Sequence, residues 1–142
     1  MLATATISLA EQLRRRIASE GPITVHDYMK TCLADPASGY YIARQPIGRS
    51  GDFITAPEIS QIFGELLGLW TASVWQSMGE PDDIILAELG PGRGTLMADA
   101  LRVIKSVPQL HERISIALIE TSPVLRESQA DALGNFDVGW FD

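Results

Sequence analysis

The chain has 142 residues, 46% of them hydrophobic, and a formal net charge of −7. This length and hydrophobic fraction suit one soluble globular domain that buries its own core. The acidic balance excludes a general nucleic-acid surface, because such a surface needs clustered Lys and Arg to neutralise phosphates.

The sequence also argues against disulfide, metal and membrane proteins. Cys32 is the sole cysteine, so there is no disulfide framework, and a reducing compartment fits. His26 and His111 lie far apart without partners at ligand spacing, so we predict no metal. No apolar run approaches the roughly 20 residues of a membrane span, and the start lacks a secretion signal. We therefore expect no membrane insertion.

The first part of the chain predicts two helices. Ser8 and Glu11 form a capping box for the first helix, which Gly21-Pro22 ends. Thr24 is placed to cap the second helix, which Asp35-Pro36 ends. Two helices in quick succession therefore precede any sheet.

The pattern changes after these helices. Tyr40-Tyr41-Ile42 and Phe53-Ile54 are short β-like pieces separated by a loop rich in turn residues. We expect a hairpin or an irregular flap here, with Asp52 inside it.

A long helix is predicted to begin at Pro57 and Glu58, because proline suits the first turn and an acid there favours the helix dipole. Its apolar stripe is predicted to pack against a sheet. Gly64 and Gly68, four residues apart, would allow close approach of another backbone. The stripe consists of Ile59, Ile62, Phe63, Leu66, Leu67, Trp70 and Val74.

The centre of the sequence predicts a strand, a tight turn and a helix. Residues 84–89 are apolar at nearly every position, as in a parallel strand buried on both faces. Glu88 is the exception, near the carboxyl end, where open α/β sheets hold their ligands. Gly90, Gly92 and Gly94 follow, and glycine lets the backbone turn sharply and approach a ligand.

The spacing of these glycines distinguishes between nucleotide ligands. A dinucleotide site is marked by G-x-G-x-x-G, whereas here Glu88 precedes G-x-G-x-G. This pattern resembles motif I of the class I S-adenosylmethionine (SAM) methyltransferases. A P-loop is excluded, because no Gly-Lys-Ser/Thr follows. A glycine-rich turn that holds no ligand is the alternative interpretation.

A second acid strengthens the ligand-binding interpretation. Glu120 ends the next apolar run, residues 115–119, near the position where nucleotide folds place a carboxylate for ribose hydroxyls. With the resemblance to motif I, this predicts SAM as the cofactor. The predicted cofactor-binding residues are Glu88, Gly90, Gly92, Gly94 and Glu120.

The rest of the chain continues the alternation. A helix is predicted over residues 95–107 and is closed by Pro108, and Ser122-Pro123 opens another helix through about Leu133. Residues 138–141 begin a third strand. The fold class is α/β, the N-terminal part of a doubly wound, Rossmann-like sheet. We predict two regions, a helical and flap region over residues 1–80 and the first half of a SAM-binding domain over residues 81–142.

A closer family resemblance covers nearly the whole chain. The chain resembles the MidA family, the bacterial counterpart of the mitochondrial complex I assembly methyltransferase. The block from Gly51 to Gln61 is far more specific than the glycines alone. The segments that carry the resemblance are Asp27-Tyr28-Met29, Gly39-Tyr40-Tyr41, residues 51–61, Phe63-Gly64-Glu65, residues 88–95 and Glu120-Thr121-Ser122-Pro123.

The resemblance implies a SAM-dependent protein-arginine methyltransferase. The mitochondrial relative methylates an arginine on a core subunit of respiratory complex I, so the implied partner is such a subunit during complex I assembly. The implied location is the cytoplasm of a bacterium or the mitochondrial matrix of a eukaryote. Family members run to several hundred residues. We therefore expect these 142 residues to be the N-terminal part of a longer enzyme and to be inactive alone.

The arginine acceptor implied by the resemblance also suggests which residues are catalytic. An arginine is protonated at neutral pH and needs carboxylates that orient it, and Asp52 and Glu58 are the candidates. Each has a structural alternative, Asp52 as a turn residue and Glu58 as a helix-dipole partner. Two other functions stay open: a non-catalytic SAM-binding assembly scaffold, and a methyltransferase for a small molecule.

Overall fold

A computed structural model describes residues 7–43, 48 and 51–142 of the chain. The chain divides into two compact units, Met1–Arg44 and Gln45–Asp142. The domain boundary predicted near residue 80 stays a prediction.

The N-terminal unit is helical over its described residues. The side chain of Ser8 accepts a hydrogen bond from the backbone N–H of Glu11, and that of Thr24 accepts one from Asp27. Ser8 and Thr24 are therefore confirmed as N-caps, whereas the carboxylate of Glu11, the other half of the predicted capping box, accepts from Nε of Arg15 at 2.9 Å. The helices are α1 (Leu9–Glu20), α2 (Val25–Ala34) and the short α3 (Tyr40–Ala43).

The helix α3 corrects the prediction of a β piece at Tyr40-Tyr41-Ile42. The backbone N–H of Gly39 donates to the carbonyl of Asp35 (2.8 Å), and the N–H of Ile42 donates to the carbonyl of Gly39 (3.0 Å). These local turn hydrogen bonds carry the chain into a helical turn, so they override the β preference of the tyrosines.

The predicted flap is described only in part. Residues 44–47 and 49–50 lie outside the described residues. The backbone N–H of Gly48 donates to the carbonyl of Phe53 at 3.0 Å, and Phe53 makes an isolated bridge.

The second unit is a parallel sheet with helices. Its strands lie in the order β1-β2-β3, with Ile84 opposite Ile114 and Ile116 opposite Val138. Alternating parallel strands and helices begin a doubly wound α/β sheet, as predicted. The elements are α4 (Ala56–Ile59), α5 (Gln61–Ser77), β1 (Ile84–Leu89), α6 (Thr95–Ile104), α7 (Pro108–His111), β2 (Ile114–Ile119), α8 (Pro123–Leu133) and β3 (Val138–Phe141).

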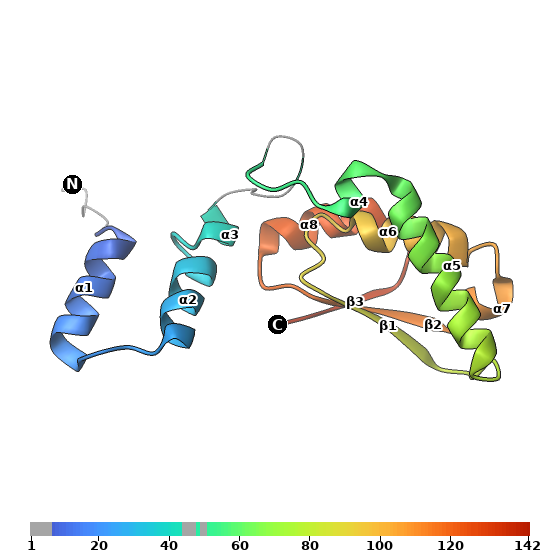
Figure 1. Cartoon of the computed structure of the whole chain (residues 1–142), viewed down its shortest axis with the longest axis horizontal. Helices are drawn as coiled ribbons and strands as arrows, with labels where there is room; N and C mark the ends of the chain where they lie inside the picture. The colour runs from blue at the N-terminus through green and yellow to red at the C-terminus, as the bar shows by residue number, and fades with distance from the viewer. Residues whose placement is uncertain (1–6, 44–47, 49–50) are drawn as a thin grey trace. The chain divides into compact units, whose positions relative to one another are not determined.

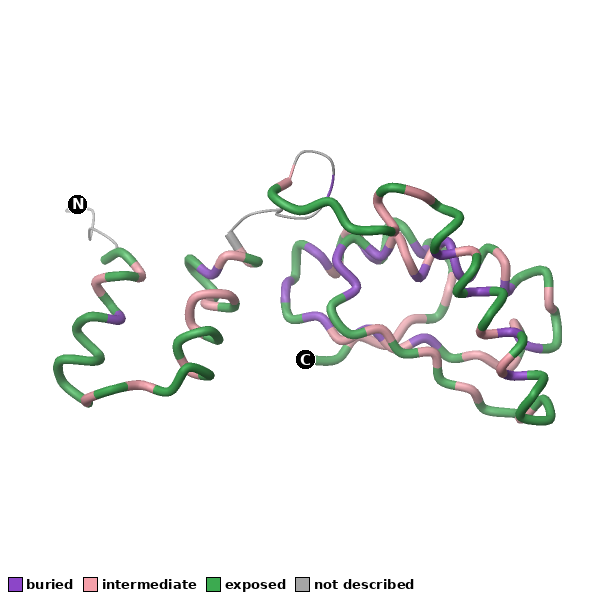
Figure 2. Tube along the Cα trace, viewed as in Figure 1, coloured by how far each residue is buried: buried purple, intermediate pink, exposed green. Residues whose placement is uncertain are grey.

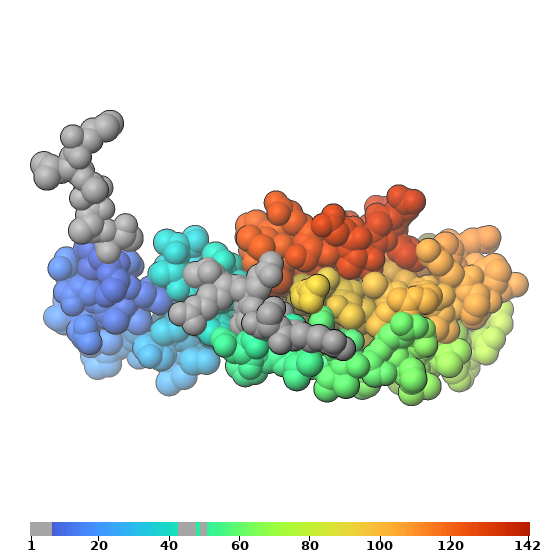
Figure 3. Space-filling view, turned by 90° about the horizontal axis from the view of Figure 1, so that it is seen from above, coloured from blue at the N-terminus to red at the C-terminus, as the bar shows by residue number. Residues whose placement is uncertain are grey.

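The helices of this unit cover one face of the sheet. Figure 1 shows α5, α6 and α8 on the same side of the strands, and in Figure 3 the orange α6 lies between the green α5 and the red α8. The buried residues of this unit in Figure 2 include many on α5, α6, α8 and β2. Ile85 and Leu89 of β1 are 71% and 79% exposed, so the prediction of burial on both faces is wrong for this chain.

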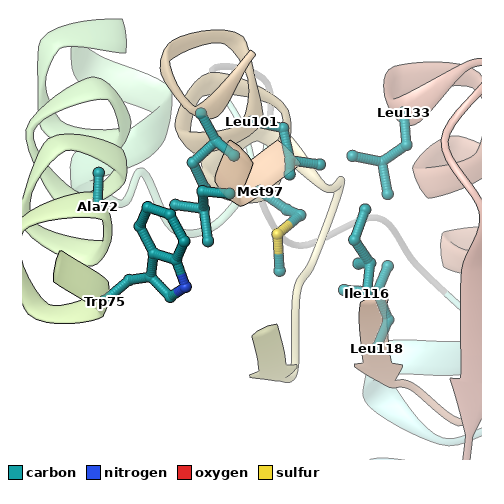
Figure 4. Close-up of a cluster of buried hydrophobic side chains, with 9 residues drawn as sticks. Ala72, Trp75, Met97, Leu101, Ile116, Leu118 and Leu133 are labelled. Atoms are coloured by element: carbon teal, nitrogen blue, oxygen red, sulfur yellow. The ribbon is translucent and has the colours of Figure 1, made fainter. Parts of the chain in front are cut away.

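The core forms where α5, α6 and α8 meet β2. Leu101, Ile104 and Leu118 are fully buried. Figure 4 shows side chains from all four elements converging there. The indole N–H of Trp75 donates to the carbonyl of Pro81 at 2.9 Å, which ties the end of α5 to the approach to β1. The labelled cluster consists of Ala72, Trp75, Met97, Leu101, Ile116, Leu118 and Leu133.

Helix α5 packs on α6 through small residues. A Cβ atom at Gly64 would lie 2.5 Å from the Cβ of Asp99, and one at Gly68 would lie 2.5 Å from the carbonyl oxygen of Ala100. The predicted close backbone approach at both glycines is confirmed.

The buried face of α5 therefore differs from the predicted one. Gly64, Gly68, Ala72 and Trp75 are buried, whereas Ile62, Leu66 and Trp70 of the predicted stripe are 62%, 59% and 63% exposed. The physical reason is that α5 is apolar on most of its circumference, so the small residues decide which side can approach α6.

Two helix boundaries also differ from the predictions. The long helix is broken at Ser60, where the backbone is extended. The side chain of Ser60 caps α5 by accepting a hydrogen bond from the N–H of Ile62. Helix α6 ends at Ile104 instead of residue 107, and Pro108 begins α7 at the position where proline suits a first turn.

Neither a membrane-spanning helix nor a metal cluster occurs among the described residues. Over residues 7–43, 48 and 51–142, no helix is both long and apolar enough to cross a membrane. In the same ranges, no three His, Cys, Asp or Glu side chains are grouped as metal ligands would be.

Candidate cofactor-binding site

The glycine turn, residues 90–94, joins β1 to α6 in a left-handed backbone. Gly90, Gly92 and Gly94 have φ values of 65°, 55° and 81°. Side chains with a Cβ rarely adopt these angles, which is why glycine occupies each alternate position. Gly94 is the N-cap of α6, and its N–H donates to the carbonyl of Pro91 at 2.9 Å.

Glu88 precedes this turn on the helix-facing side of β1. Its Oε2 atom is buried and accepts no hydrogen bond from any residue that the structure describes. Burial disfavours the charged form and raises the pKa of Glu88 from 4.5 to about 7. A buried carboxylate oxygen without such a donor is costly, so this atom is a candidate acceptor for a ligand.

A cavity of about 310 Å³ lies between α4 and the glycine turn. Glu88 and the turn supply one wall, and Pro57, Glu58 and Phe63 supply another. Residues far apart in the sequence thus enclose one space at the carboxyl end of β1, where open α/β sheets bind ligands.

Glu58 connects the two walls. Its Oε1 atom accepts a hydrogen bond from the hydroxyl of Thr95 at 2.6 Å, and its Oε2 atom lies 3.4 Å from Nη1 of Arg93. The Glu58 side chain is only 11% exposed. The two predicted roles of Glu58 are catalytic carboxylate and helix-dipole partner. The structure adds a third role, because Glu58 attaches α4 to the start of α6.

Glu120 lies at the carboxyl end of β2, the neighbouring strand. It is 9% exposed, and its Oε1 atom accepts from the backbone N–H of Ser122 at 2.8 Å. Because Leu89 pairs with Ile119 across the two strands, Glu88 and Glu120 lie at the same edge of the sheet.

The sequence prediction missed Gln129, a fully buried residue of α8. Its side-chain nitrogen donates to the carbonyl of Gly92 at 2.8 Å and lies 3.4 Å from Oε2 of Glu120. The available signal was its position: Leu125, Gln129 and Leu133 share the buried face of α8, and Gln129 is the polar member.

Some of the predicted site residues line the cavity, and others do not. Glu58, Glu88, Gly90 and Gly92 all line the cavity. Glu120 is connected to the glycine turn through Gln129, and Asp52 is exposed in the segment before α4. The catalytic roles of Asp52 and Glu58 stay predictions.

These features define a class of site. An acid and a glycine turn after one parallel strand, with a second acid at the end of the next strand, form the nucleotide-cofactor site of a Rossmann-like fold. The Oε2 atom of Glu88, which has no donor among the described residues, fits a ligand with hydrogen-bond donors or a positive charge.

Comparisons with known proteins identify the family. Residues 66–142 match the family described as S-adenosyl-L-methionine-dependent methyltransferases. The chain belongs to this family. The predicted resemblance is thereby confirmed.

Named relatives share about half of the aligned residues. The chain is 54% identical to the mitochondrial protein arginine methyltransferase NDUFAF7 homolog of Drosophila melanogaster, over 87% of this chain and 28% of the relative. It is 51% identical to mitochondrial NDUFAF7 of Homo sapiens, over 86% of this chain and 28% of the relative. The chain thus spans under a third of the length of these relatives.

Solved structures confirm the fold. A COG1565 superfamily member from Burkholderia thailandensis, bound to S-adenosyl-homocysteine, superimposes with a TM-score of 0.78 at 33% identity. The match covers 94% of this chain and 36% of that protein. A native structure of a COG1565 superfamily protein from the same organism gives a TM-score of 0.69 at 32% identity, over 94% of this chain and 34% of that protein.

Proposed function

We propose that this chain is the cofactor-binding part of a SAM-dependent protein-arginine methyltransferase that acts on a core subunit of respiratory complex I during its assembly. The observation that carries the proposal is the buried Oε2 atom of Glu88, without a donor in the described chain, beside a turn of three left-handed glycines. The names of the relatives supply the acceptor, arginine.

The residues of the site fit the parts of SAM. Glu120 would accept hydrogen bonds from ribose hydroxyls, since a carboxylate has lone pairs beyond the one that the Ser122 N–H engages. Gly90 and Gly92 would allow close backbone approach. Glu88, when ionised, would favour the positively charged part of the ligand. Bound SAM would supply a methyl group activated by its sulfonium.

The role of the chain is chiefly positioning. The sulfonium is already a good leaving group, so the protein has to hold the two reactants together and assist loss of a proton from the acceptor. An arginine acceptor is charged and would need carboxylates for orientation. Asp52 and Glu58 are proposed for this task. Glu58 is positioned by Thr95 at the cavity wall.

The proposed location in the cell follows from the proposed substrate, a subunit of respiratory complex I. Complex I assembly would place the protein in the mitochondrial matrix of a eukaryote or in the cytoplasm of a bacterium. The relatives are named as mitochondrial.

The test has two stages, both on the complete protein. Calorimetry should show binding of SAM and S-adenosylhomocysteine, with NAD as a ligand that does not bind. Mass spectrometry of complex I core subunits from a deletion strain should then show loss of arginine methylation, which the wild-type gene restores. Binding without any lost methylation would favour the scaffold, and methylation lost from a small molecule would favour the other enzyme.

A further inference from the structure

Gln129 is the buried polar residue that connects the separate parts of the site. It is 0% exposed, and its side chain makes polar contacts with the glycine turn, the end of β2 and β3. Burying an amide is costly unless its groups are paired. These contacts satisfy both ends of the amide.

Trp140 determines which way the amide faces. An indole N–H can only donate, so the atom that Trp140 meets at 2.9 Å is the amide oxygen of Gln129. The NH₂ group must therefore face the opposite side. There it donates to the carbonyl of Gly92 and contacts the carboxylate of Glu120.

This orientation constrains the glycine turn. The carbonyl of Gly92 is held toward α8, and the C=O and N–H of a trans peptide point in opposite directions, so the N–H of Arg93 points away from α8. The turn and α8 also lie in close contact, since a Cβ at Gly94 would be 3.2 Å from the Cα of Gln129.

The same amide orients the second acid. The Oε1 atom of Glu120 is held by the N–H of Ser122 at 2.8 Å, and its Oε2 atom lies 3.4 Å from the amide nitrogen of Gln129. Both oxygens thus have a protein donor on one side, which leaves further lone pairs for hydroxyl donors of a ligand.

We propose that Gln129 is a positioning residue that fixes the glycine turn and Glu120 relative to each other, so that both contact the same nucleoside ligand. The inference rests on the proposed function, because it assumes that this ligand carries ribose hydroxyls. It adds a residue of α8 to a site otherwise built from α4, the start of α5, β1, the end of β2 and the glycine turn.

The test compares two ligands on the complete protein. Calorimetry would give dissociation constants for S-adenosylhomocysteine and for its 2′,3′-dideoxy analogue, which lacks the hydroxyls that Glu120 would accept. Gln129→Met keeps the length of the side chain and removes its donors. We expect about tenfold weaker binding of S-adenosylhomocysteine, the size of effect caused by an unpaired buried polar group, and a clearly smaller loss for the analogue.

A second variant and a control complete the design. Gln129→Glu places a carboxylate beside Glu120 and the Gly92 carbonyl, so it should weaken S-adenosylhomocysteine more than Gln129→Met does. Glu127→Gln, on the exposed side of the same helix, should change neither constant. Thermal unfolding without ligand shows which variants fold. If Gln129→Glu does not fold, the comparison of Gln129→Met with the wild type tests the inference.

Three outcomes would overturn the inference. Unchanged affinity for S-adenosylhomocysteine in both Gln129 variants would show that the amide positions nothing that the ligand contacts. Equal losses for the two ligands would show a structural role without an effect on the ribose. A wild-type protein that binds neither ligand would refute the proposed function, and the role of Gln129 with it.

Discussion

The Oε1 atom of Glu58 accepts a hydrogen bond of 2.6 Å from the hydroxyl of Thr95, although 37 positions separate the two residues in sequence. This bond attaches α4 to the first residue of α6. Glu58 and Thr95 both line the cavity that Glu88 also lines.

Thr95→Val should weaken the folded state and the cofactor site together. The substitution removes the short hydrogen bond to the nearly buried Glu58 carboxylate and leaves it the longer contact with Arg93, at 3.4 Å. We therefore expect a loss of about 1 to 2 kcal/mol in the free energy of unfolding. Urea unfolding measures the loss. Thr31→Val is the matched control, because the hydroxyl of Thr31 donates to a carbonyl of its own helix, Asp27 C=O at 2.8 Å.

Comparison of the variants Glu58→Gln and Thr95→Val distinguishes two roles of Glu58. If Glu58 only positions the turn, Glu58→Gln and Thr95→Val should raise the dissociation constant of SAM to a similar extent and change kcat little. If Glu58 orients the acceptor arginine, Glu58→Gln should lower kcat far more than Thr95→Val does. Steady-state kinetics of the complete enzyme with both variants distinguishes these results.

Glu88 should make stability depend on pH. Its pKa is about 7 in the folded chain against an ordinary value of 4.5, so between these values the folded state keeps a proton that the unfolded state releases. Its contribution to the free energy of unfolding is therefore fully present below pH 4.5 and is lost as the pH rises through about 7. The free energy of unfolding of the wild type should therefore fall relative to that of Glu88→Gln, which stays neutral, as the pH rises across this range. A constant difference would contradict the raised pKa.

Gly92→Val should abolish SAM binding. The φ of 55° at Gly92 is unfavourable for a branched side chain, and the added atoms would occupy the surface that the ligand needs. Gly79→Val is a control for backbone strain alone, because Gly79 has a φ of 85° and a Cβ there would meet no heavy atom of the described chain within 4 Å. Normal binding by Gly92→Val would refute the assignment of the glycine turn to the cofactor.

Gly68→Ala should destabilise the contact between α5 and α6. The new methyl group would meet the backbone of Ala100 at 2.5 Å, and backbone cannot move aside as a flexible side chain can. We expect a loss of about 1 to 3 kcal/mol in the free energy of unfolding, as for overpacked cores. Ser73→Ala, on the exposed side of α5, should change this quantity by less than about 0.5 kcal/mol.

The 142 residues expressed alone should self-associate and show no methyl transfer. Ile85 and Leu89 are 71% and 79% exposed on the open face of β1, and apolar surface of this kind associates in water. Ile85→Lys and Leu89→Lys together should make the chain more monodisperse in analytical ultracentrifugation. A wild-type chain that is monomeric and active would contradict the expectation.

The sequence predicted the glycine turn and its acids because that information is local. Alternate glycines, an acid two residues before them and an apolar run all lie within one short stretch, where spacing is set by the backbone. The strands of the sheet followed from the same kind of pattern.

The buried face of α5 could not be predicted from its apolar residues. Most sides of this helix are apolar, so the large residues do not indicate one face, and the decision is made by Gly64 and Gly68 against α6. The role of Gln129 was equally inaccessible. Its partner Gly92 is 37 positions away, and only the folded chain shows which polar groups an amide on a buried helix face will meet.

The contact between Gln129 and Gly92 also bears on the order of events during synthesis. The ribosome releases the N-terminal part of a chain first, so the glycine turn emerges 37 positions ahead of the amide that holds its carbonyl. Until α8 has emerged and packed, the Gly92 carbonyl lacks this donor, and the turn has only hydrogen bonds to residues that precede α8, such as the one from the N–H of Gly90 to the carbonyl of Ile119. A nascent chain should therefore acquire ligand affinity when α8 docks, and a pause in translation between these two points would lengthen the time during which the turn is incomplete.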